Sequence, residues 1–92
     1  MSDAIVLPER LDLSSVPALA ATLRARPADE KLSVDASAVT HFGALGLQVL
    51  MSAAIRNNAA GGAISLHRVP DRVLGQMTAM GTSPAQIVET RK

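Results

Sequence analysis

The chain has 92 residues, of which 48% are hydrophobic and 1% aromatic, and its formal net charge is +1. This size suits one small domain, residues 1–92, with an aliphatic core. Scattered Lys and Arg residues with a single aromatic side chain argue against a nucleic-acid surface. The absence of cysteine and the isolation of both histidines argue against a disulfide or a metal site. No apolar run approaches the roughly 20 residues of a membrane-spanning helix, so we expect a cytoplasmic protein without membrane insertion.

The first third of the chain predicts two short strands and a helix. Residues 4–7 form a short apolar run, and residues 11–13 are a second strand candidate. Residues 15–26 carry apolar side chains at helical spacing, which predicts an amphipathic helix that Pro27 ends.

The middle of the chain repeats this alternation. Residues 31–36 are a strand candidate, and the pattern from 44 to 59 is helical. Gly61 and Gly62 supply the stop, where a left-handed residue is needed. Residues 63–69 alternate weakly and are predicted to form a strand.

The last segment predicts one more helix and one more strand. The helix opens at Pro70 and runs through Met80, after which Gly81 closes it, and residues 87–88 fall in a last short strand. Strands that alternate with helices imply right-handed crossovers and a mostly parallel sheet. We expect an α/β fold with a sheet of four to five strands and helices mainly on one face.

Three runs of residues resemble a known family. They are LDLSSVPAL at 11–19, DASAV at 35–39, and GALGL at 43–47. Together with the spacing of the following glycines and helix, they resemble the STAS domain, named after sulfate transporters and anti-sigma factor antagonists. The resemblance covers nearly the whole chain and implies the same α/β fold, with a short or missing last helix.

The resemblance also places a regulatory position on this chain. The family's phosphorylated Ser or Thr corresponds to Ala44, and the acidic residue before it corresponds to Gly43. An alanine cannot accept a phosphoryl group, so no phosphorylation is expected at this position. Thr40 is a weak candidate for a displaced site, and a turn hydroxyl is the preferred interpretation. His41 is interpreted as a surface turn residue rather than a base.

The helix expected from residue 44 has apolar residues inside its polar side. Its sheet-facing side, at 100° per residue, comprises Leu47, Leu50, Met51 and Ala54, with Gly46 and Ala53 at the edge. The docking patch predicted on the opposite side and in the preceding turn consists of Gly43, Ala44, Leu45, Gln48, Ser52 and Ile55. Ordinary scatter is the alternative, since single exposed apolar residues are common.

These observations favour a non-catalytic regulatory module that binds a protein. The resemblance implies an anti-sigma factor antagonist or a chemotaxis component in bacterial signalling, with a histidine-kinase-like anti-sigma protein or a chemotaxis protein as partner. The alternative is the cytoplasmic STAS subunit of an ABC-type lipid transport complex. No cofactor is expected, because the glycine turn at 43–46 lacks a Walker-type Lys. The sequence leaves open whether the chain forms a homodimer.

Overall fold

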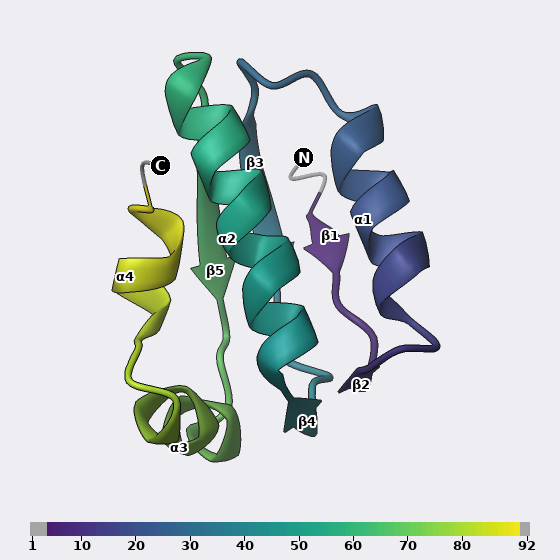
Figure 1. Cartoon of the computed structure of the whole chain (residues 1–92), viewed down its shortest axis with the longest axis vertical. Coiled ribbons are helices and arrows are strands. Elements are labelled where there is room, and N and C mark those ends of the chain that lie inside the picture. Colours follow the sequence, from purple (N-terminus) through teal and green to yellow (C-terminus); the bar gives the residue numbers. More distant parts are fainter. Residues whose placement is uncertain (1–3, 91–92) are drawn as a thin grey trace.

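The computed structural model describes residues 4–90 (Figure 1). Five strands, all paired in parallel, form a three-stranded sheet in the order β1-β3-β5 and a two-stranded sheet of β2 and β4. Their bounds are β1 (Ile5–Val6), β2 (Arg10–Leu11), β3 (Lys31–Asp35), β4 (His41–Phe42) and β5 (Ala63–His67). The predicted α/β class with mostly parallel strands is confirmed, and the structure adds the division into two sheets.

The helices pack mainly against one face of the larger sheet (Figure 1). They are α1 (Val16–Ala25), α2 (Ala44–Ala59), α3 (Asp71–Ala79) and α4 (Pro84–Val88). Along β3, Leu32 and Val34 are buried whereas Ser33 and Asp35 are half-buried, as alternating strand residues require when helices cover one face. The expectation of helices on one face is therefore confirmed.

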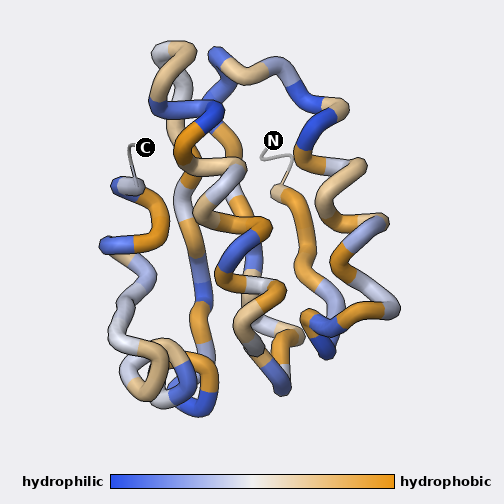
Figure 2. The backbone as a smooth tube through the Cα atoms, viewed as in Figure 1, coloured by the Kyte–Doolittle hydropathy of each residue, from blue (hydrophilic) through white to orange (hydrophobic). Residues whose placement is uncertain are grey.

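The core lies between the sheet and the helices and is aliphatic. Figure 2 shows hydrophobic residues recurring along α1 and α2 and in the strands behind them. Phe42, the single aromatic residue, is 2% exposed and belongs to this core. The sheet-facing side predicted for α2 is confirmed, because Leu50 and Ala54 are fully buried and Leu47 and Met51 pack against the core.

Two glycines shape the end and the packing of α2, and the sequence predicted the first of these roles. Gly61, just past α2, has φ +87°, which is the left-handed conformation expected at the helix end. Gly46 lets α2 approach β2 closely, because a Cβ built there would lie 2.9 Å from Cβ of Leu11.

The prediction of a last strand at 87–88 is wrong, because these residues belong to α4. Ser83 caps this helix by accepting a hydrogen bond from the Gln86 amide at 3.2 Å, and Pro84 occupies its first turn. Ile87 is buried, so the apolar pair marks the inner side of a single helical turn. Two apolar residues alone do not distinguish a strand from such a turn.

Several smaller boundaries also differ from the predictions, and two of them share a cause. The second strand is Arg10–Leu11 rather than 11–13, and His41 lies in β4 rather than in a turn. Both shifts have one cause, because β2 and β4 pair with each other across a long sequence separation. Residues 1–3 and 91–92 of the predicted domain lie outside the described part of the chain.

Candidate functional site

The turn into α2 presents backbone and one small side chain to solvent. Gly43 is the N-cap residue, with φ −105° and ψ −173°, and no side chain caps the helix. Ala44 follows as the first helical residue and is exposed. A Cβ at position 43 would lie 3.2 Å from Nε2 of His41, so a larger residue there would press on this imidazole.

Side chains and backbone from two distant segments hold this turn in place. The Phe42 amide donates to Oε1 of Gln76 at 2.6 Å, and Nε2 of Gln76 donates to the Thr40 carbonyl at 3.4 Å. On the other side, the Thr40 amide and hydroxyl donate to the Glu9 carbonyl at 2.8 and 3.2 Å. The Thr40 hydroxyl thus participates in a loop contact, although the residue is exposed.

Gln76→Ala should lower the free energy of unfolding by about 1–2 kcal/mol, because it leaves the amide of the buried Phe42 without its side-chain acceptor. Chemical denaturation measures this loss. Gln48→Ala is the matched control, since Gln48 is exposed on α2, and it should stay within about 0.5 kcal/mol of wild type. Equal stabilities for the two variants would show that the Gln76 carboxamide does not hold the turn.

The predicted docking patch follows the outer side of α2. Ala44, Gln48 and Ser52 are exposed, one helical turn apart from one another. Leu45 and Ile55 are half-buried on opposite flanks of this exposed line. The six residues therefore form a strip with polar side chains in the middle and a branched apolar side chain on each flank.

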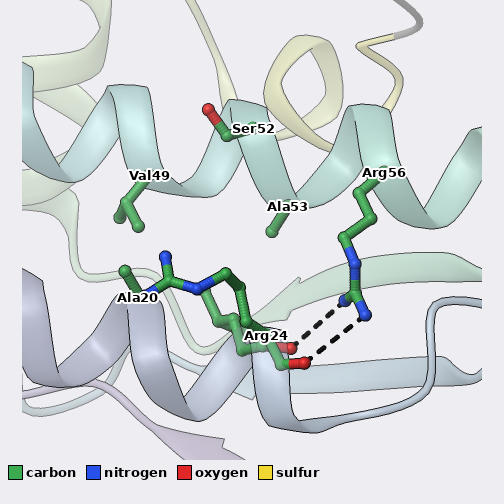
Figure 3. A pocket seen from close by; sticks show the side chains of 7 residues that line it. Ala20, Arg24, Val49, Ser52, Ala53 and Arg56 are labelled. Atoms are coloured by element: carbon green, nitrogen blue, oxygen red, sulfur yellow. Dashed lines mark hydrogen bonds between the residues drawn. The ribbon is translucent and has the colours of Figure 1, made fainter.

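A groove between α1 and α2 lies along the Leu45 flank of the patch. Its deeper part, about 160 Å³ in volume, is mostly apolar and is shown in Figure 3. It is lined by Ala20, Leu23, Arg24, Val49, Ser52, Ala53 and Arg56. A wider extension of about 250 Å³ is lined by Val16, Arg24, Leu45, Gln48, Val49 and Ser52. Three residues of the docking patch thus line what we call the α1–α2 groove.

Arg56 closes one end of this groove and ties the two helices together. Its guanidinium donates to the carbonyls of Leu23 and Arg24 at 3.4 Å and to that of Arg26 at 3.1 Å (Figure 3 shows two of these bonds). These carbonyls belong to the C-terminal end of α1, where a cation is favourable. The position of Arg56 on the polar side of α2 gave no signal of this role.

Leu13 is a further candidate that the sequence interpretation placed inside a strand. It is 80% exposed, the largest exposed fraction among the large apolar side chains of the described chain. Strands β2 and β4 run parallel to each other, and Leu11 at the end of β2 pairs with Phe42 at the end of β4. Leu13 comes just after β2, and Ala44 comes just after β4. Leu13 therefore belongs to the same end of the molecule as the docking patch.

The face of the sheet opposite the helices carries polar residues. Asp35 accepts a hydrogen bond from the Ser37 amide at 2.8 Å and lies 3.9 Å from the Arg68 guanidinium. These contacts, led by the Ser37 amide, lower the pKa of the Asp35 carboxyl below its ordinary value. Ser65 Oγ lies 3.0 Å from Nε2 of His67, yet the same hydroxyl also contacts the Leu32 carbonyl at 3.3 Å.

Stability should fall in acid, partly because of Asp35. A carboxyl whose folded pKa is lowered stabilises the fold above the unfolded pKa, about 4, and this contribution is lost as pH falls through the folded value. The Asp35→Asn variant should therefore show a smaller drop in unfolding midpoint between about pH 5 and pH 2 than wild type. Asp12, whose pKa Ser14 lowers, keeps part of the dependence. Parallel acid profiles for both proteins would contradict this role.

Two further features of residues 4–90 concern metal binding and membrane crossing. These residues contain no group of three or more His, Cys, Asp or Glu side chains arranged to hold a metal ion. Within the same range, no helix is both long and apolar enough to cross a lipid bilayer.

Comparison with known proteins gave a family match. The family model described as "Mlab, STAS domain" matches residues 2–88 of the chain, which is nearly its whole length. A search of curated proteins returned no match. The family match spans every strand and helix described above.

Proposed function

The chain belongs to the STAS domain family, and we propose that it is a non-catalytic module that binds its protein partner through the docking patch on α2. STAS domains are generally regulatory modules that mediate protein–protein interactions, in the manner of anti-sigma factor antagonists. The docking patch supports this use here, because it combines exposed polar groups with apolar flanks beside a groove.

The observation that carries the proposal is the exposure of Ala44 at the start of α2. A phosphate at this position would add about −1.5 to −2 charge and would break a packed interface by repulsion and desolvation. Alanine has the size and neutrality of an unmodified small side chain and cannot be phosphorylated. We infer that the patch stays competent to bind, and that release depends on competition or concentration.

The proposed setting is bacterial signalling. The partner is then a histidine-kinase-like anti-sigma protein or a chemotaxis component. Thr40 is not part of the proposed switch, because its hydroxyl already donates to the Glu9 carbonyl within the loop. Neither a cofactor nor catalysis is required for this function.

A second candidate is a STAS subunit of an ABC-type lipid transport complex that docks on the ATPase. Ala44 favours it to the same degree, since a structural subunit needs no phosphoswitch. The same helix face would serve as the interface. The identity of the captured partner separates the two candidates.

Leu45→Asp should abolish partner capture, because it places a charge on the half-buried apolar flank of the docking patch. The measurement is affinity purification of the tagged chain from cells that make it, followed by mass spectrometry of the bound proteins. Leu74→Asp on α3 is the matched control, because Leu74 is 37% exposed and lies outside the patch.

Capture of one protein by wild type and Leu74→Asp, with loss in Leu45→Asp, supports the proposal. Equal recovery by all three proteins would remove the docking patch as the interface. An anti-sigma or chemotaxis protein in the bound fraction would favour signalling, and a transporter ATPase would favour the second candidate.

A further inference from the structure

The charged side chains that line the α1–α2 groove all have one sign. Neither the VPALAATLRA sequence of α1 nor the ALGLQVLMSAAIRNNA sequence of α2 contains Asp or Glu. The charged side chains that line the groove are Arg24 and Arg56. The remaining lining is mostly apolar, with Ala20 and Ala53 as small residues on its floor.

Arg24 supplies the groove cation that no acidic side chain of the described residues neutralises. Figure 3 shows its side chain lying over the groove beside Ala20 and Val49. Arg24 is exposed, and no carboxylate among residues 4–90 pairs with it. Arg56, in contrast, bonds to the carbonyls at the end of α1.

The shape of the groove suits a helix. Two neighbouring parallel helices leave a channel between them into which the side-chain ridge of a third helix packs. Small floor residues such as Ala20 and Ala53 allow the close approach that this packing needs. A helix bound in this way presents apolar residues at positions i, i+3, i+4 and i+7.

The positive charge of the α1–α2 groove distinguishes among three possible occupants, which are a second copy of the chain, a membrane surface and a segment of another protein. A second copy of the chain would bring the same face, which has Arg24 and no acidic residue on either helix, so like charges would meet. A membrane surface is recognised by clusters of about four to eight basic residues, whereas the groove has a single uncommitted Arg. A protein helix with an apolar face and carboxylates beside it fits the groove, because its apolar face matches the apolar lining and its carboxylates match Arg24.

We propose that the α1–α2 groove binds an acidic amphipathic helix of the partner protein, with a partner carboxylate on Arg24. This inference rests on the proposed function and specifies the chemistry of the partner segment. The groove then extends the docking patch through Leu45, Gln48 and Ser52, which line both.

The probe is a pair of capped synthetic peptides of about 20 residues, since isolated helices shorter than about 12–15 residues are marginal in water. Both peptides carry Leu and Ala on one side of the helix. At the positions that flank this apolar side, the acidic peptide has Glu and the basic peptide has Lys. Amide resonances of the full chain are followed by NMR during titration. We expect the acidic peptide to shift the amides of Ala20, Val49 and Ala53, and the Lys peptide to leave them unchanged.

Charge reversal supplies the decisive comparison. Arg24→Glu should raise the Kd of the acidic peptide about five- to tenfold, and added salt should weaken binding to wild type. Arg72→Glu on α3, an exposed arginine outside the groove, changes the net charge equally and should leave the Kd within about twofold.

Equal response to both peptides, or equal Kd values for the two reversal variants, would overturn the proposal. Groove shifts that grow with protein concentration without peptide would show a second copy there and overturn it as well. The proposal would also be overturned if the chain bound phosphatidylglycerol vesicles and its groove amides did not respond to the acidic peptide. If Ala44→Asp still weakens binding of the captured partner in any of these cases, the proposed function stands and the groove inference alone fails.

Discussion

Gly62→Ala is expected to lower the free energy of unfolding by more than about 3 kcal/mol. A Cβ at this position would lie 2.5 Å from the carbonyl oxygens of both Ala28 and Glu30 and 2.8 Å from the carbonyl carbon of Asp29. All three atoms are backbone, so no flexible side chain can move to make room.

The same corner is also held by hydrogen bonds, which limits any backbone shift. The Gly62 amide donates to the Asn57 carbonyl at 2.8 Å, and the Ala63 amide donates to the Glu30 carbonyl at 3.2 Å. Asn57 is fully buried there, and its Nδ2 donates to the Glu30 carbonyl at 3.4 Å. The end of α2 is thus locked onto the loop that precedes β3.

Gly75→Ala is the matched control and should change stability in the opposite direction. No atom lies within 4 Å of a Cβ built at Gly75, in the middle of α3, and alanine stabilises a helix interior by about 0.5–1 kcal/mol relative to glycine. Urea denaturation of both variants measures the difference. Two alanine variants of similar stability would contradict the close approach at Gly62.

Ala44→Asp should weaken binding of the captured partner by about thirtyfold, whereas Ala44→Ser should stay within about threefold of wild type. Aspartate introduces a negative charge at the start of α2, whereas serine adds a neutral hydroxyl of similar size to the native side chain. The fold should tolerate both changes, because an acidic residue in the first turn of a helix is favourable. Isothermal titration with the purified partner gives the three affinities.

Ala18→Asp is the matched control for this charge. Ala18 is exposed in the first turn of α1, so the substitution has the same chemistry in the same helical context but outside the docking patch. Its affinity should equal that of wild type. If the aspartate at position 44 binds as tightly as the one at position 18, Ala44 lies outside the interface.

Most helices and strands could be predicted from the sequence, because the periodicity and the turn residues that mark them lie within the same segment. The bounds of α2, 44–59, were predicted as observed, since helical periodicity and the following glycines mark them. The strand predicted at 87–88 failed because a capping serine and a proline outweigh two apolar residues in such a short segment. Local pattern thus suffices for long elements and fails for single turns.

The contacts that hold the site in place could not be predicted, because they join residues far apart in the sequence. Gln76 meets Phe42 across a separation of 34 residues, and Arg56 meets Arg24 across 32. No spacing within either helix predicts these contacts, because they arise only when α3 packs against β4 and α1 packs against α2. The exposed strip of α2 that we propose as the docking patch could be predicted as a helix face, whereas the groove beside it required the position of α1.

Hydrogen–deuterium exchange of the chain, alone and bound to its captured partner, tests the docking patch most directly. The amides in the first turn of α2 lack intrahelical acceptors and exchange readily when uncovered. Slower exchange across residues 37–48 on binding, with residues 63–69 of the open sheet face unchanged, is the expected result. Slower exchange at 63–69 with 37–48 unchanged would place the partner on the opposite face and contradict the account.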